Sequence, residues 1–219
     1  MKIKCLILDH DDTSVESTPF IHYPAHLEVM RQLRPNHPAV NLEEWFLKNF
    51  SPGIMSYMTE ELGFTEEEVN EEYRIWRGFT EERIPPFFPG YLDILREYKR
   101  RGGIITVVSH SEEDLIRRDY NHADAEDLPG LVFGWNFDAE KRKPHPYPVL
   151  EILKHYGLAP RDALIVDDLK PAVEMSRTSA VPIAAAGWGH SIPSIRCYME
   201  QNCQHYLSSV EEFRTLLFS

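Results

Sequence analysis

The sequence predicts an α/β protein built on a doubly wound parallel sheet, with a helical segment inserted after the first strand. Short apolar runs at 3–8, 104–108 and 163–166 each end at a polar residue, which is typical of strands buried on both faces of a parallel sheet. From residue 90 onward such strands alternate with helical patterns, which favours βαβ units with helices on both faces. Residues 15 to 88 contain no convincing apolar strand, so we expect a helical insert there.

The insert is predicted to contain four helices, at about 23–33, 42–50, 54–62 and 65–77. The last begins with Thr65-Glu66-Glu67-Glu68, a capping-box pattern, and Gly63 provides a stop for the helix before it. Prolines and a glycine between 85 and 90 mark the return to the sheet. We therefore expect a core formed by 1–14 and 89–219 and a helical domain formed by 15–88.

The second half of the chain is predicted to alternate helix and strand. Ser111-Glu112-Glu113-Asp114 resembles another capping box, and Gly157 and Ser209 mark a helix end and a helix start. Five helices are expected in this half. The first spans about 90–101, the second begins at 111, the third runs from about 148 to 157, the fourth begins near 171 and the fifth follows Ser209. The expected strands are 104–108, a weaker one at 131–133, 163–166 and 182–186.

Composition narrows the classes of partner. The chain has 219 residues and a formal net charge of −12, which argues against a nucleic-acid binder and against binding to anionic membranes. A local cation can still admit an anionic substrate. No run of 18 apolar residues occurs, so no membrane span is expected. Strand-like sequence begins at once and leaves no room for a signal peptide.

The three cysteines are Cys5, Cys197 and Cys203. An odd count, with one cysteine in a core strand, suggests reduced thiols and a cytoplasmic protein. Zinc ligation by Cys197, Cys203 and His205 is an alternative, but their spacing matches no common zinc pattern.

Polar residues follow three of the predicted strands: Asp9, then Ser109, then Asp167 with Asp168. Because ligands bind outside the carboxyl ends of strands in open α/β sheets, we expect these side chains to share one crevice. Asp9 and Asp11 stand two residues apart, so both can reach one reaction centre. One carboxylate can attack phosphorus, and the other can protonate a leaving oxygen and later deprotonate a water. A solvated acidic turn is the alternative for this loop alone.

Converging carboxylates repel one another unless a cation joins them. Mg²⁺ prefers carboxylate oxygens and keeps several waters, and the pair Asp167-Asp168 favours such a site over a helix N-cap, which needs only one acid. Lys143 can neutralise phosphate charge and hold an attacking carboxylate, although a surface position is usual for lysine. Ser109 can donate a hydrogen bond to a phosphate oxygen, or can cap a helix.

Four motifs, taken in their order along the chain, together resemble those of the haloacid dehalogenase-like hydrolase superfamily. They are the Asp9-x-Asp11-x-Thr13 loop, the strand ending in Ser109, the Lys143-Pro144 segment and the strand ending in Asp167-Asp168. The resemblance covers nearly the whole chain. The helical insert after the first motif is similar to the C1-type cap of that superfamily, and the nearer match is the phosphatase and β-phosphoglucomutase-like branch. Asp12 stands where glycine is frequent, and we expect aspartate to tolerate an unusual turn conformation there.

The resemblance implies roles for these residues. Asp9 would be the nucleophile that forms an aspartyl-phosphate, and Asp11 the general acid and base. Ser109 and Lys143 would bind the transferring phosphoryl group. The implied Mg²⁺ ligands are Asp9, the backbone carbonyl of Asp11, and Asp168, with Asp167 acting through a water on the metal.

The leading hypothesis is a cytoplasmic Mg²⁺-dependent phosphohydrolase for a small phosphorylated metabolite, as a monomer or homodimer. A sugar-phosphate mutase shares every residue discussed. A 2-haloacid dehalogenase does not need the second acid, Asp11, and works without Mg²⁺. A receiver-type phosphoacceptor domain is typically much shorter and lacks the insert. A non-catalytic binding module would not need acids at every motif.

Overall fold

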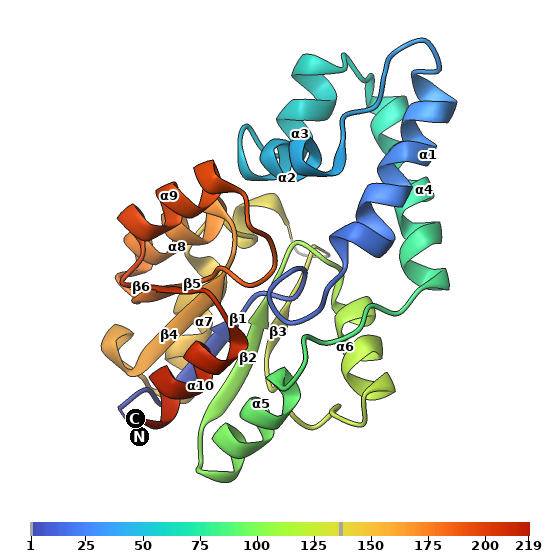
Figure 1. Cartoon of the computed structure of the whole chain (residues 1–219). Coiled ribbons are helices and arrows are strands. Elements are labelled where there is room, and N and C mark those ends of the chain that lie inside the picture. The colour runs from blue at the N-terminus through green and yellow to red at the C-terminus, as the bar shows by residue number, and fades with distance from the viewer. Residues whose placement is uncertain (1, 136–137) are drawn as a thin grey trace. The chain divides into compact units, whose positions relative to one another are not determined.

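The computed structural model describes residues 2–135 and 138–219, so residues 1, 136 and 137 of the predicted core lie outside the described part. The chain divides into two compact units (Figure 1). One unit, here called the sheet unit, consists of Met1–Glu16 and Phe87–Ser219. The other, the helical unit, consists of Ser17–Pro86.

Within the described residues, the sheet unit contains one six-stranded sheet with the order β3-β2-β1-β4-β5-β6, and every neighbouring pair is parallel. The strands are β1 (Cys5–Leu8), β2 (Ile104–Val108), β3 (Val132–Phe133), β4 (Ala163–Asp167), β5 (Ile183–Ala186) and β6 (His205–Leu207). The direction of strand addition reverses between β1 and β4, which is the place where such sheets bind ligands. The predicted doubly wound α/β fold is confirmed.

Helices cover both faces of this sheet (Figure 1). They are α5 (Tyr91–Arg100), α6 (Glu113–His122), α7 (Tyr147–Tyr156), α8 (Lys170–Ser179), α9 (Pro193–Asn202) and α10 (Val210–Phe218). Tyr91 of α5, Ile116 of α6 and Phe213 of α10 are buried in one cluster with Leu6 and Leu8 of β1. Helices α7 and α8 contact β2 and β4 on the opposite face. Since alternate residues of a strand face opposite ways, Leu6 and Leu8 define the side of the sheet that α5, α6 and α10 cover.

The helical unit has its own apolar core, which includes Val29, Trp45, Tyr57 and Ile75. Its helices are α1 (Tyr23–Leu33), α2 (Leu42–Phe50), α3 (Ile54–Ser56) and α4 (Glu66–Glu82), with π-helical turns at Thr18–His22 and Tyr57–Glu61. The predicted capping box at the start of α4 is present, because Thr65 accepts from the Glu68 amide and the Glu68 side chain accepts from the Thr65 amide.

One α-helix and one strand of the sheet unit were not predicted. Helix α9 buries only Ile195 and Met199 among its ten residues, so its amphipathic pattern is weak. Strand β6 is three residues long at the sheet edge. The predicted capping by Ser111 is wrong, since α6 has Glu112 as its N-cap residue and no side-chain cap. Among the described residues, no helix combines the length and apolar character needed to cross a membrane.

Candidate active site

The first loop begins where β1 ends, and neighbouring strands set its position. The backbone N–H of Asp9 donates to the carbonyl of Val166 in β4 at 2.9 Å, so Asp9 is level with Asp167 across the parallel pair. Leu8 faces the α5–α6–α10 side, and alternation directs Asp9 to the other side. The backbone carbonyl of Asp9 accepts from the Ser14 hydroxyl at 2.7 Å, which ties the loop back on itself.

Lys143 links the two strand ends. Its Nζ lies 2.7 Å from Asp9 Oδ1 and 2.8 Å from Asp167 Oδ2, and all three side chains are almost completely buried. Burial by itself lowers the pKa of a lysine, but the charges of Asp167 and Asp9 outweigh it and raise the pKa of Lys143. The lysine is therefore a fixed positive charge between two carboxylates, and the alternative of a surface lysine is wrong.

Asp167 and Asp168 have different surroundings. The second oxygen of Asp167 accepts from the Leu169 amide at 2.9 Å, so both of its oxygens have protein partners. Asp168 accepts from the Thr13 hydroxyl at 3.4 Å and lies 3.8 Å from His190 Nε2. Burial, followed by repulsion from Asp167, Asp9 and Asp12, raises the pKa of Asp168 well above its usual range.

Ligand atoms of Asp9, Asp167 and Asp168 lie within 4.8 Å of one another, and the described residues contain no other such group of three or more acidic, histidine or cysteine side chains. Three buried carboxylates face one ammonium here, so the group carries surplus negative charge. Hard carboxylate oxygens of this kind suit a hard divalent cation. The group therefore fits Mg²⁺ by its chemistry, and the zinc alternative at Cys197, Cys203 and His205 has no support.

The loop between β2 and α6 reaches Asp11. Ser109 directly follows β2, where its N–H donates to Phe133 of β3, and its hydroxyl accepts from the Ser111 amide at 3.2 Å. The Ser111 hydroxyl donates in turn to Asp11 Oδ2 at 2.5 Å. Ser109 is therefore not the N-cap of α6. The serine that contacts Asp11 is Ser111, which the sequence pattern had predicted to cap this helix.

A second loop, after β5, packs against the first. Asp12 takes a left-handed conformation with φ of 53°, as expected for the position where glycine is frequent. A Cβ on Gly189 would lie 2.2 Å from the Asp12 carbonyl oxygen, so only glycine allows this approach. The Trp188 Nε1–H donates to the Thr13 carbonyl at 3.0 Å. Residues 187–190 therefore support the first loop directly.

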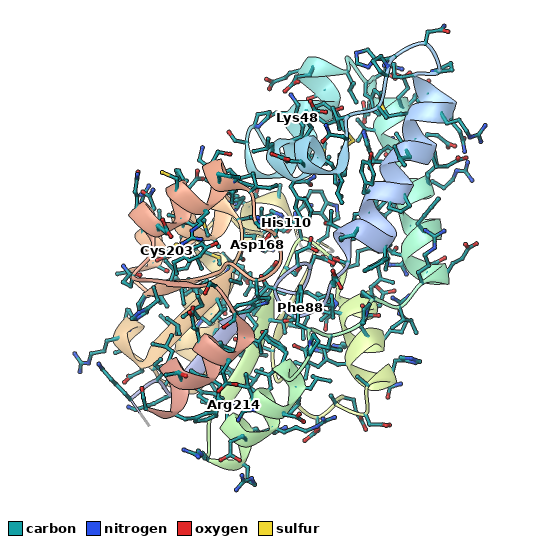
Figure 2. The ribbon with its side chains drawn as sticks, viewed as in Figure 1. Lys48, Phe88, His110, Asp168, Cys203 and Arg214 are labelled. Carbon is teal, nitrogen blue, oxygen red and sulfur yellow. The ribbon has the colours of Figure 1, made fainter. Side chains whose placement is uncertain are left out.

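Two histidines beside the motifs point to partners of their own. His10 Nε2 lies 3.0 Å from Asp119 Oδ2 in α6, on the side of the sheet opposite Asp9, and Asp119 Oδ1 accepts from Arg118. His110 Nε2 donates to the Lys143 carbonyl at 2.9 Å, and burial lowers its pKa to about 4. His110 and Asp168, both labelled in Figure 2, belong to the loops that follow β2 and β4. The alternation of side chains along a strand accounts for the direction of His10, whereas no local signal in the sequence pointed to Asp119.

A profile of the haloacid dehalogenase-like hydrolases matches residues 6–186, which span the sheet unit from β1 to β5 and the helical unit. The chain belongs to the haloacid dehalogenase-like hydrolase family. The family predicted from the four motifs is confirmed, and with it the prediction of a hydrolase enzyme.

Named relatives agree with this membership. The chain is 24% identical over 205 residues to phosphoglycolate phosphatase 1 of Pseudomonas aeruginosa, covering 86% of this chain and 71% of that protein. It is 22% identical over 192 residues to phosphoglycolate phosphatase of Nitrosococcus oceani, covering 85% and 84%. A crystal structure described as a predicted phosphoglycolate phosphatase from Haemophilus somnus superposes with a TM-score of 0.80 at 17% identity, covering 99% of this chain and 98% of that one. This last likeness establishes the fold.

Proposed function

We propose that the protein is a Mg²⁺-dependent phosphomonoester hydrolase that works through an aspartyl-phosphate on Asp9. The observation that carries the proposal is the buried group at the ends of β1 and β4, in which Lys143 bridges Asp9 and Asp167 and Asp168 lies beside them. Family membership and the phosphatase names of the relatives support the reaction class.

Asp9 is the proposed nucleophile. Its carboxylate oxygen forms a bond to phosphorus while the bond between phosphorus and the leaving oxygen breaks. Lys143 balances the charge of the phosphoryl oxygens, and the Ser109 hydroxyl donates to one of them. Since both oxygens of Asp167 are already engaged, by Lys143 and by the Leu169 amide, we assign Asp167 the role of orienting the lysine. Such fixed charges stabilise the transition state without rearranging during the reaction.

Asp11 is the proposed general acid and base. In the first step it gives its proton to the leaving oxygen, which departs as an alcohol. In the second step it takes a proton from water as the water oxygen bonds to phosphorus, and the bond between Asp9 and phosphorus breaks. The products are inorganic phosphate and regenerated Asp9, and Asp11 is protonated again.

The proposed metal ligands are side-chain oxygens of Asp9 and Asp168 and the backbone carbonyl of Asp11. When bound, Mg²⁺ supplies positive charge to the phosphoryl oxygens and to the carboxylates around them. Asp168 fits this assignment because burial and neighbouring carboxylates oppose its ionised form, and a cation relieves that opposition. Thr13 holds Asp168 through its hydroxyl.

The proposed substrate is a small phosphorylated metabolite, with 2-phosphoglycolate as the first compound to test because the named relatives share that designation. We propose a cytoplasmic enzyme that acts as a monomer or homodimer and needs no nucleic acid or membrane. The sugar-phosphate mutase alternative differs in product: a mutase returns an isomeric phosphate ester and a hydrolase releases inorganic phosphate.

The test is a release assay for inorganic phosphate on a panel containing 2-phosphoglycolate, hexose phosphates and an aryl phosphate, with Mg²⁺ and with a chelator. The proposal predicts Mg²⁺-dependent release by the wild type and none by Asp9→Asn with an unchanged circular dichroism spectrum. Asp127→Asn is the matched control, because Asp127 belongs to the same unit and is exposed beside Lys99. Full activity in Asp9→Asn, or release unaffected by the chelator, contradicts the proposal.

A further inference from the structure

Ser111 occupies a place that the family motifs leave unassigned. It lies between β2 and α6 and is 5% exposed. Its hydroxyl donates to Asp11 Oδ2 at 2.5 Å instead of capping the helix that starts two residues later. A serine hydroxyl next to a helix start ordinarily satisfies helix N–H groups, so its use on a carboxylate elsewhere leaves α6 without that stabilisation.

The backbone of Ser111 is held on both sides. Its N–H donates to the Ser109 hydroxyl at 3.2 Å, and its carbonyl accepts from the Trp135 N–H at 2.9 Å. Gly134 lies against the same turn, and a Cβ there would come within 2.6 Å of the Ser111 carbonyl oxygen and 2.7 Å of the Glu113 nitrogen. A side chain on a backbone fixed this way reaches Asp11 with little freedom to move, which is what orienting a reactive group requires.

We propose that Ser111 is a positioning residue for Asp11, holding Oδ2 of the carboxylate so that the proton exchanged in the reaction is carried by Oδ1. The inference rests on the proposed function, in which Asp11 is the general acid and base. The donated hydrogen from Ser111 occupies Oδ2 and disfavours protonation there. The proton on Oδ1 then passes to the leaving oxygen as the phosphorus–oxygen bond breaks, and a water proton later returns to Oδ1. Ser111 itself forms and breaks no covalent bond.

Leaving groups differ in how much they need this proton. An alkoxide is a poor leaving group and depends on general acid catalysis, whereas a nitrophenolate departs with little help. The ratio kcat/KM covers the steps up to departure of the leaving group. A residue that orients the acid therefore affects kcat/KM for an alkyl phosphate more than for a nitrophenyl phosphate. A residue that only supports the fold lowers both values alike.

The experiment measures kcat/KM with Mg²⁺ for glycerol phosphate and for p-nitrophenyl phosphate in wild type, Ser111→Ala and Ser111→Thr. We expect Ser111→Ala to lose about tenfold on the alkyl ester, the effect of one hydrogen bond to a charged group, and clearly less on the aryl ester. Ser111→Thr keeps the hydroxyl and is expected to retain the wild-type ratio between the two esters. Ser176→Ala is the matched control, since Ser176 is 6% exposed in the same unit and its hydroxyl donates to Val181.

Equal losses on the two esters, or no loss on either in a folded Ser111→Ala, overturn the inference. If Ser111→Ala does not fold, Ser111→Cys takes its place, because a thiol is a weaker donor of similar size, and its selective loss on the alkyl ester supports the inference in the same way. If the wild type hydrolyses 2-phosphoglycolate but not glycerol phosphate, 2-phosphoglycolate takes the place of the alkyl ester in the same comparison. A wild type that releases phosphate from neither these esters nor any member of the panel refutes the proposed function, and the inference falls with it. A wild type active on both, with a Ser111→Ala that leaves their ratio unchanged, refutes the inference alone.

Discussion

Two buried charge clusters lie on opposite sides of the same loop, and they differ in whether the protein completes them. On one side Asp9, Asp167 and Asp168 share a single ammonium, that of Lys143. On the other side His10 meets Asp119, which is also paired with Arg118. In the cluster of His10 and Asp119, the guanidinium of Arg118 balances the carboxylate. In the cluster of Asp9, Asp167 and Asp168, three carboxyl groups are buried with one ammonium.

The comparison distinguishes a charge cluster that the protein neutralises by itself from one that it leaves with more carboxylates than cations. Burying an unpaired charge costs several kcal/mol, on the order of 3–5, so an incomplete cluster of carboxylates either takes up protons or is completed by a bound cation. Surface pairs such as Arg31–Glu28 contribute little by comparison, because solvent screens them. We therefore expect mutations on the two sides of the first loop to respond differently to Mg²⁺.

The largest expected effect is that of Lys143→Met. Removing the ammonium leaves Asp9 and Asp167 buried without their shared partner, so the free energy of unfolding is expected to fall by about 3–5 kcal/mol, and turnover to be lost. Urea denaturation measures the first and phosphate release the second. Lys154→Met, on the exposed side of α7, is the control and should change neither. A Lys143→Met variant as stable as wild type would show that the two carboxylates do not need the lysine.

A smaller effect is expected for Asp119→Asn, which removes the charge that holds His10 and Arg118. The loss of charge-assisted hydrogen bonds should lower the free energy of unfolding by about 1–2 kcal/mol. Because this cluster is complete without an ion, the increase in melting temperature on adding Mg²⁺ should equal that of the wild type. A reduced response to Mg²⁺ in this variant would erase the distinction between the two clusters.

Asp168→Asn is expected to raise the free energy of unfolding of the metal-free protein, whereas the two substitutions above lower it. The substitution removes one of three mutually repelling carboxylates, so the metal-free protein should gain about 1 kcal/mol of stability, as is common when functional groups are replaced. The same variant should show no stabilisation by Mg²⁺. Thermal denaturation with a chelator and with Mg²⁺ measures both, and a metal-free variant less stable than wild type would contradict the excess of negative charge.

The smallest expected effect is a dependence of Mg²⁺ stabilisation on pH. Burial, with the charge of Asp9 adding to it and Lys143 opposing it, raises the pKa of Asp167 to about 7. The folded pKa is above the unfolded one, so this group favours the metal-free fold at low pH, and that contribution is lost as the pH rises through about 7. Because a cation held by Asp9 and Asp168 and a proton on the neighbouring Asp167 disfavour each other, the effect of Mg²⁺ on the melting temperature should be larger at about pH 8 than at about pH 5. An Mg²⁺-induced rise in melting temperature that is equal at the two pH values, or larger at the lower one, would contradict this prediction.

The sequence predicted the parts of this site that depend on local pattern. The strand ends at Asp9, Ser109 and Asp167 are visible because a short apolar run stops at each of them, and parallel pairing then brings the ends to one edge. The helix ranges 23–33 and 42–50 agree with α1 and α2 to the residue. In these places local signals and tertiary structure point to the same result.

The parts that escaped prediction depend on partners distant in sequence. Ser111 has a valid capping pattern, but a carboxylate a hundred residues earlier takes its hydroxyl. The need for glycine at 189 comes from the backbone of Asp12. Asp119 looks like any acid on a helix until His10 is placed beside it. Such contacts leave no periodic trace in the sequence, so only coordinates reveal them.

The most direct test of the central claim is chemical trapping of the phosphorylated enzyme. An Asp11→Asn variant incubated with Mg²⁺ and p-nitrophenyl phosphate should release nitrophenolate once and then hydrolyse its aspartyl-phosphate slowly, because the base is missing. After an acid quench, peptide mapping by mass spectrometry should find one phosphoryl group on Asp9. A phosphoryl group on any other residue would contradict the account, as would nitrophenolate release by Asp9→Asn at the wild-type rate.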